Sequence, residues 1–280
     1  PQIFFGAALC CFVASTTANA GSPVWKVTSA DGGTLYVGGS VHALKRSDYP
    51  LPAAFNHALD NSSHVVFETE EPTAEEAKYF TKAAEYTRGD SLQKHVDPRT
   101  YAYLKRLFSL VGVPEGKFNR YNAWALTLFL QSPSHQGLSS DLGVEGYLAK
   151  RAKARKKPVS GLVSAREHFA VYTDLTAKQA EAVLLLTLIP QADVSRQAIM
   201  KAWRRGDTDY LWRMSRESYS DYPAFAERIL EARNRAWIPK LEGYLRSGKT
   251  HFVVVGAAHL GGPEGVLALL RDRGYSIEQL

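Results

Sequence analysis

Two stretches of the chain share one pattern, in which an apolar run is followed by Gly-x-x-His. The first stretch ends at His42 and the second at His259. A third apolar run, residues 64–67, leads directly into Glu68 and Glu70. Imidazole nitrogens and carboxylate oxygens together form a ligand set that suits Zn, Mn, Co or Fe. The three segments therefore predict a divalent-metal site, provided that the fold brings them together.

The same residues also have a purely structural interpretation. His42 and His259 can cap loops by hydrogen bonding to backbone carbonyls, and Glu70 can lie in solvent. Glu68 and Glu70 are two residues apart, so in an extended strand they share a face. One of the two carboxylates can then bind an ion while the other acts as a base.

These side chains meet only if their runs form neighbouring parallel strands, because open α/β sheets bind ligands outside the carboxyl ends of their strands. Residues rich in β-branched and aromatic types predict strands over 24–27, 34–38, 64–67, 159–162, 251–255 and 275–279. Asp31-Gly32-Gly33 between the first two is typical of a hairpin. We therefore predict an α/β fold with a central mixed, largely parallel sheet built from both ends of the chain.

The middle of the chain, about residues 91–245, has the periodicity of helices. We predict a single domain over residues 21–280, with this stretch as a large helical insertion. One or two helices are expected over 223–245, with an interruption at Pro239. A last helix is expected over 263–273, with Pro263 in its first turn. Its N-terminus would follow His259 closely and could hold an anion.

The first twenty residues differ from the rest, since they carry no charge and are mostly apolar until Val13. They end in Ala18-Asn19-Ala20, which is typical of a signal-peptidase site. We interpret residues 1–20 as a secretory signal peptide, which places the mature chain in the periplasm or outside the cell. The cysteines, Cys10 and Cys11, fall within this segment, so a disulfide or a thiolate ligand in the mature chain is excluded.

The net charge and the composition of the chain limit the kinds of molecule that it is expected to bind. The chain has 280 residues, 34 Lys and Arg against 28 Asp and Glu, and a net charge of +6. This modest excess, without a basic stripe or zinc-finger spacing, gives no indication of nucleic-acid binding. No apolar run is long enough to predict a transmembrane span.

The paired motifs resemble those of the TraB/GumN family, which is related to the TIKI metalloproteases and more remotely to erythromycin esterases and ChaN-type haem-binding proteins. The resemblance covers nearly all of the chain after residue 20. It rests on residues 24–27, 34–42, 65–70, 143–148, 231–234 and 255–265.

The resemblance implies a secreted or periplasmic α/β protein that binds a divalent metal, such as Mn, Co or Zn, through His42, Glu68 and His259. It also implies that Glu70 is a second carboxylate of the site and that Arg233, in the pair Arg233-Asn234, binds an anionic group or transition state. TIKI-type relatives are metal-dependent proteases, so the resemblance favours a metal-dependent hydrolase of the metallopeptidase type, with a peptide or another small envelope compound as substrate.

One departure from the family pattern bears on activity. Where the family often has Gly-Leu-Glu with a Gln five positions after the Glu, this chain has Val163 and His168. Glu167 or His168 could take over the missing role. The departure motivates an alternative hypothesis, a non-catalytic envelope protein that binds a peptide, haem or a glycan. A further alternative is an accessory of polysaccharide export.

Overall fold

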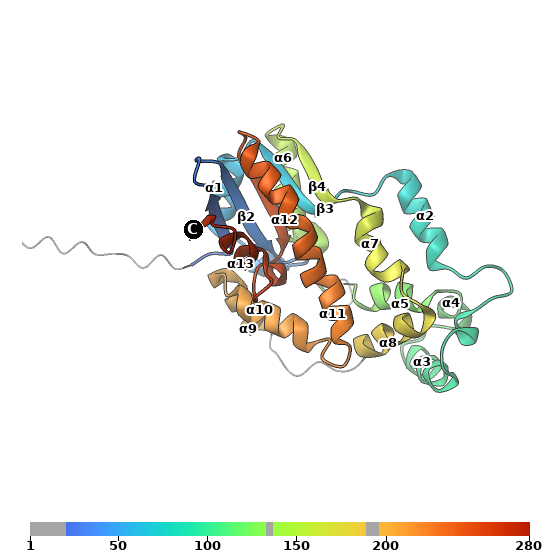
Figure 1. Ribbon diagram of the computed structural model, residues 1–280. Helices are drawn as coiled ribbons and strands as arrows, with labels where there is room; N and C mark the ends of the chain where they lie inside the picture. The colour runs from blue at the N-terminus through green and yellow to red at the C-terminus, as the bar shows by residue number, and fades with distance from the viewer. Residues whose placement is uncertain (1–20, 133–136, 189–195) are drawn as a thin grey trace, which may run out of the picture.

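The computed structural model describes residues 21–132, 137–188 and 196–280. The predicted signal peptide, residues 1–20, lies outside these described residues. The described strands form a six-stranded sheet in the order β4-β3-β5-β2-β1-β6. The strands are β1 (Val24–Thr28), β2 (Thr34–Ser40), β3 (His64–Thr69), β4 (Val159–Val163), β5 (His251–Gly256) and β6 (Ser276–Gln279). Figure 1 shows that the sheet combines blue strands from the start of the chain with red strands from its end.

The pairing of the strands confirms the predicted mixed sheet. Strands β4, β3, β5 and β2 are parallel to one another, whereas β1 is antiparallel to both β2 and β6. The predicted hairpin is formed by β1 and β2, with Thr28 opposite Thr34. The central strand β5 is buried along its whole length. It lies between β2 and β3, so the carboxyl ends of these three parallel strands are neighbours.

Two helical layers cover the sheet because alternate residues of each strand face opposite sides. On β5, Phe252 and Val254 pack with α1, α6 and α9, whereas Val253 and Val255 pack with α12 and α13. These helices are α1 (Ala53–Asp60), α6 (Val144–Ala154), α9 (Arg196–Arg205), α12 (Glu231–Arg246) and α13 (Val266–Arg271). On β3, Val66 packs on the α12 side, and the alternation carries Glu68 to that same side.

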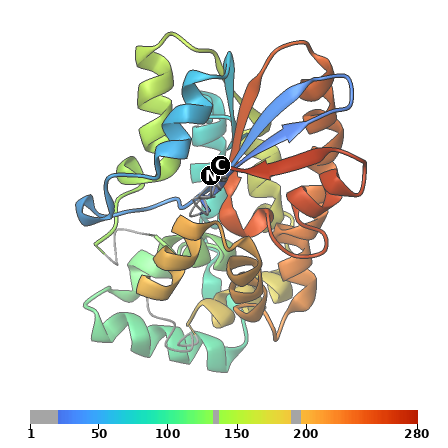
Figure 2. The same cartoon turned by 90° about the vertical axis from the view of Figure 1, so that its left-hand side faces the viewer.

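A third apolar cluster lies away from the sheet, among helices from the middle of the chain. These helices are α2 (Ala74–Ala84), α3 (Pro98–Leu110), α4 (Glu115–Phe118), α5 (Ala123–Leu130), α7 (Ala165–Thr173) and α8 (Ala177–Leu188). Two further helices, α10 (Thr208–Glu217) and α11 (Pro223–Ile229), precede α12 in the chain. In Figure 2 the teal and green helices of this part lie below the sheet. The stretch predicted as a helical insertion, about residues 91–245, also contains strand β4, which pairs with β3.

Two predicted helix boundaries are wrong. Pro239 does not interrupt its helix: α12 runs through it, and the break falls at Leu230, whose φ of −117° and ψ of −83° separate α11 from α12. Packing of Trp237, Ile238 and Leu241 against the sheet outweighs the cost of the proline. The last helix begins at Val266, not at Pro263.

Within the described residues, we find no helix with both the length and the apolar character needed to cross a membrane.

A pair of histidines lies at the amino ends of the parallel strands β3 and β5, and for this pair we predict an effect of pH on the stability of the fold. His64 and His251 are partners in the β3–β5 ladder, with ring centroids 5.3 Å apart. Burial, and after it the charge of Lys249, lowers the pKa of His64; burial is also the main cause that lowers the pKa of His251. The unfolded chain therefore binds protons more readily than the folded one, so this contribution to stability is complete above about pH 6.5 and is lost as the pH falls below it.

The measurement is the free energy of unfolding by urea at pH 7.5 and pH 5. We expect His251→Phe, which keeps the ring stacked on Tyr244 at 4.5 Å, to lose less stability between the two pH values than the wild type. An equal loss in both proteins would contradict the prediction.

Candidate functional site

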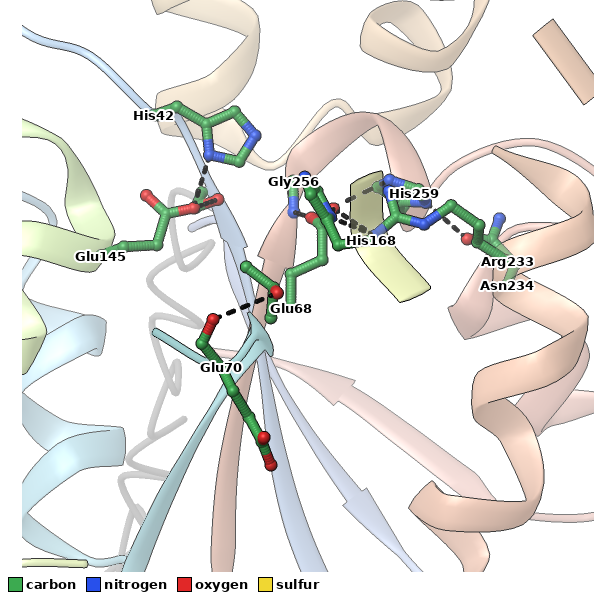
Figure 3. A network of polar contacts seen from close by, with 11 residues as sticks. His42, Glu68, Glu70, Glu145, His168, Arg233, Asn234, Gly256 and His259 are labelled. Atoms are coloured by element: carbon green, nitrogen blue, oxygen red, sulfur yellow. Dashed lines mark hydrogen bonds and ion pairs between the residues drawn. The ribbon is translucent and has the colours of Figure 1, made fainter. Parts of the chain in front are cut away.

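The residues singled out by their sequence pattern come from the adjoining carboxyl ends of three parallel strands. His42 follows β2, Glu68 lies near the end of β3, and His259 ends the 3₁₀ turn η5 (Ala257–His259) after β5. Since β5 lies between β2 and β3, its last residue, Gly256, is at the centre of this edge. Figure 3 shows these side chains from close by.

The absence of a side chain at Gly256 creates the space that the site residues surround. A Cβ atom placed there would lie 3.3 Å from Cδ2 of His259, 3.4 Å from Nε2 of His42 and 3.7 Å from Oε2 of Glu68. Three side chains that are far apart in the sequence thus border one small volume. The topology brings together the three residues predicted as metal ligands.

Glu68 is the buried carboxylate of the site, with 6% of its surface exposed. Its Oε1 lies 2.6 Å from Nη2 of Arg233, and its Oε2 accepts a hydrogen bond from the Gly256 N–H at 3.2 Å. Burial by itself raises the pKa of Glu68, but interactions with His259, Arg233 and His42 outweigh it, so the pKa lies well below its usual range. Glu68 is therefore ionised, and its charge is balanced from the α12 side of the sheet.

His259 is held in one tautomer by a chain of hydrogen bonds. The Asn234 amide donates from Nδ2 to the backbone oxygen of Glu264 at 2.9 Å, which turns its Oδ1 toward Nδ1 of His259 at 2.7 Å. Nδ1 of His259 therefore carries the proton, and Nε2 presents its lone pair 3.9 Å from Oε2 of Glu68. Burial lowers the pKa of His259 to about 3, so the ring is neutral at neutral pH.

His42 is on the open side of the site, with 66% of its side chain exposed. Its Nδ1 lies 2.7 Å from Oε1 of Glu145, in the first turn of α6. The same carboxylate oxygen accepts a hydrogen bond from the Ser40 hydroxyl at 2.5 Å. The negative charge of Glu145 raises the pKa of His42 above its ordinary value. Both histidines thus use Nδ1 for an anchoring contact, which leaves Nε2 to face the space beside Gly256.

Arg233 and His168 complete the network on the side of α12. The guanidinium of Arg233 lies over the Trp237 ring at 4.8 Å and approaches Nδ1 of His168 at 3.0 Å. Since Arg233 can only donate, Nδ1 of His168 is the acceptor and the ring proton is on Nε2. Nδ1 of His168 also lies 3.6 Å from Oε1 of Glu68. Burial lowers the pKa of His168, so it enters the network as a neutral ring.

The structure distinguishes between the two residues considered as replacements for the missing family glutamate. Glu167 caps α7, where its Oε2 accepts hydrogen bonds from the backbone N–H and the hydroxyl of Ser164 at 2.8 and 2.9 Å. His168, one residue later, is the one that reaches Glu68. Val163 ends β4 and packs against the apolar cluster beneath α12.

The structure does not bring Glu70 into this group. Glu70 follows the end of β3, is exposed, and extends its carboxylate away from His42 and His259 in Figure 3. Its Cγ folds over Gly161, where a Cβ would come within 2.7 Å of it. The expectation that Glu68 and Glu70 share a face assumed an extended strand, and β3 has ended at Thr69.

The expected helix N-terminus next to His259 is also absent. The segment after η5 turns at Gly262, whose φ is +81°, and its N–H donates to Oδ1 of Asp209 at 2.8 Å. Helix α13 starts later and has six residues. The N–H of Gly262 is therefore engaged within the protein, and what the segment provides to the site is the Glu264 carbonyl that orients Asn234.

As they stand, the side chains do not form a closed coordination sphere: no group of three His, Cys, Asp or Glu residues in the described part of the chain is close enough to hold a metal ion. The chemistry of the donors nevertheless fits one. The lone pair of His259 Nε2 and the ionised Oε2 of Glu68 face each other across 3.9 Å, a separation compatible with two ligands that are each about 2.0–2.2 Å from one ion.

Two members of the network, Glu145 and His168, were not among the site residues predicted from the sequence, although His168 was considered as a replacement for the missing family glutamate. Glu145 belongs to the segment 143–148 that matched the family pattern, but an acidic residue in a first helical turn is also explained by the helix dipole. His168 appeared only as the replacement of a family glutamine. Their contacts join residues 100 or more positions apart, His42 with Glu145 and Glu68 with His168, and no local pattern reports such pairs.

Comparisons with known proteins give one result at the level of the family. No curated protein and no solved structure matches this chain. A sequence model of the TraB/PrgY/gumN family matches residues 23–279, which include every residue of the network described above. The chain belongs to the TraB/PrgY/gumN family.

Proposed function

We propose that the protein is a metal-dependent hydrolase, with peptides as the substrate class that its kinship favours. The observation that carries the proposal is the arrangement of donors at Gly256. His259 Nε2 and Glu68 Oε2 face each other as two acceptors, and His42 Nε2 borders the same space. Two electron-pair donors that face each other without a shared proton are stabilised by a cation between them.

The surroundings of the donors resemble those of ligands in metal sites. Ligating histidines commonly engage their other ring nitrogen with a carboxylate or an amide, which fixes the ring and its tautomer. Here Glu145 provides this contact for His42 and Asn234 for His259. Glu68 would provide the carboxylate ligand through Oε2, because Oε1 is occupied by Arg233.

Each residue of the network has a part in such a reaction. A divalent ion held by His42, Glu68 and His259 would polarise a carbonyl and lower the pKa of a bound water toward about 7. Arg233 holds the Glu68 carboxylate in its orientation by the contact at 2.6 Å. His168 carries its proton on Nε2 and can donate it in a hydrogen bond to a substrate oxygen. We assign no step to Glu70, whose carboxylate points away.

The proposal is tested by metal content and turnover together. Protein prepared without metal is titrated with Zn, Mn and Co by calorimetry, and each loaded form is incubated with a peptide library. We expect one ion per chain and cleavage, both lost in His42→Ala and His259→Ala. His57→Ala, an exposed histidine on α1, is the matched control and should behave as wild type. The absence of ion binding and of cleavage in the wild type would overturn the proposal.

A second function is supported by the Arg233–Glu68 contact, since this ion pair balances the buried carboxylate without any metal. The site would then bind a peptide, haem or a glycan without turnover, as Val163 in place of the family glutamate also suggests. Tight binding of a peptide without cleavage, or a Soret band on titration with haem, would favour this function over hydrolysis.

Export through the predicted signal peptide, to the periplasm or beyond, is part of the same proposal. It is tested by expressing the full chain with a C-terminal tag and determining the N-terminal residue of the fractionated product. A mature protein that starts at Gly21 outside the cytoplasm is expected. An unprocessed cytoplasmic chain would contradict export.

A further inference from the structure

A three-residue chain of contacts ends at the exposed histidine of the site. The Ser40 hydroxyl donates to Oε1 of Glu145 at 2.5 Å, and the same oxygen lies 2.7 Å from Nδ1 of His42. Ser40 is the last residue of β2 and pairs with Gly256 in the sheet. The contacts therefore connect the strand edge, the start of α6 and the histidine that borders the space beside Gly256 (Figure 3).

The backbone is built to bring α6 against the His42 loop. Gly143 precedes α6, and a Cβ at this position would be 2.2 Å from the carbonyl oxygen of His42, so only glycine allows the approach. The next residue, Val144, donates its N–H to the Val41 carbonyl at 3.1 Å. These two main-chain approaches hold the start of α6 against the His42 loop and so place Glu145 beside His42.

His42 needs such support more than the other site residues do. Its side chain is 66% exposed, whereas those of Glu68 and His259 are 8% and 7% exposed. Packing holds the buried pair in place, but the ring of His42 can rotate unless a hydrogen bond fixes it. Glu145 is the residue that makes this contact.

The second oxygen of Glu145 indicates that the carboxylate is not present for stability alone. Within the described residues, Oε2 is buried and has no hydrogen-bond partner. A buried, unsatisfied polar atom costs about 1–3 kcal/mol. The fold thus tolerates an unsatisfied Oε2 atom, with its cost in stability, while Oε1 contacts His42 and Ser40. Such a cost is typical of a residue that is retained for a function.

We propose that Glu145, supported by Ser40, is a positioning residue that fixes the ring orientation of His42, with Nδ1–H toward the carboxylate and Nε2 toward Gly256. The consequence for ligand binding rests on the proposed function, but the orientation itself does not. Without Glu145, the exposed ring is free to rotate in solvent, which takes Nε2 away from the site.

The test is a long-range ¹H–¹⁵N spectrum of histidine-labelled protein, with His42 assigned from the spectrum of His42→Gln. In the wild type we expect Nδ1 of His42 to be protonated and held, with shifts unlike those of an unfolded histidine. Glu145→Ala should give the pattern of a free histidine. Glu145→Gln keeps an acceptor oxygen and should keep Nδ1 of His42 protonated and held, and Ser40→Ala should give a pattern between those of the wild type and Glu145→Ala.

Asp90→Asn is the matched control, because Asp90 makes a similar contact at 2.8 Å with His95, far from the site. It should change the resonances of His95 and leave those of His42 unaltered. An unchanged His42 in Glu145→Ala, in protein with wild-type circular dichroism, would overturn the proposal.

Metal affinity separates this proposal from the proposed function. If the wild type binds Zn, Mn or Co, Glu145→Ala should weaken binding by about 10–100-fold. If the wild type binds no metal while the His42 spectrum responds to Glu145→Ala, the positioning role stands and the metal-dependent function fails.

Discussion

Replacing Arg233 by methionine is expected to lower the free energy of unfolding by about 3–5 kcal/mol, because it leaves a charge buried without its partner. Glu68 has 6% of its surface exposed, and Arg233 approaches its Oε1 at 2.6 Å. Methionine retains the length and apolar surface that pack on Trp237 while it removes the positive charge. The measurement is chemical denaturation at neutral pH, followed by circular dichroism.

A double variant separates the buried charge from the loss of packing. Arg233→Met combined with Glu68→Gln removes both charges, and we expect it to recover most of the stability lost in the single variant, because both partners of a buried pair are then neutral. Arg233→Lys keeps the charge but not the planar guanidinium, so it should lie between the wild type and Arg233→Met. A loss below about 1 kcal/mol in Arg233→Met would indicate that water screens Glu68 as it does a surface carboxylate.

The part of the fold that positions the site could be predicted from sequence because each of its elements has a local signal. The apolar runs before His42, Glu68 and His259 are short and rich in β-branched residues, and each is closed by glycine or a polar residue. All three form strands, and β2, β5 and β3 are parallel neighbours as the proposed convergence required. The prediction succeeded because a buried central strand tolerates no polar residue until its end.

The predictions that failed concern places where tertiary packing outweighs a local preference. Pro239 marks the expected end of a helix, yet α12 continues because its apolar face is buried against the sheet. Glu70 was expected beside Glu68, but the strand ends between them and the side chain folds over Gly161. The space that the Glu70 side chain takes is left free by Gly161 on strand β4, and the sequence next to Glu70 gives no indication of this glycine.

The ion pair between Arg233 and Glu68 could not be predicted from the sequence either, because Arg233 was expected to bind a group that is not part of the protein. Arg233 was assigned to an anionic substrate or transition state, and in the structure its contact is with Glu68. The two assignments share one physical basis, a guanidinium that requires an anion. Only the relative placement of β3 and α12 determines that the nearest anion belongs to the protein.

Replacing Gly256 by alanine is expected to abolish the proposed metal binding and hydrolysis while the fold persists. A Cβ there would occupy the space bordered by His42, Glu68 and His259, at 3.3 to 3.7 Å from the nearest atom of each. Gly256 has a φ of −51° and a ψ of 134°, which alanine adopts without strain. The contact at 3.3 Å with the buried His259 ring is slightly short and requires a shift of a few tenths of an ångström, whereas His42 can yield freely because its side chain is 66% exposed. We therefore expect a change in the free energy of unfolding within about 1 kcal/mol, as for other small, tolerated substitutions.

The effect on ligand binding should be much larger, because the methyl group takes the position toward which the donor atoms point. We expect metal affinity and turnover to fall by about 100-fold or more, the loss that a displacement of about 1 Å brings to a preorganised site. Gly116→Ala, at an open position in α4, is the matched control and should alter neither stability nor binding appreciably. If Gly256→Ala binds metal and substrate as the wild type does, the space beside Gly256 is not where the ligand sits, and the three side chains around it act separately.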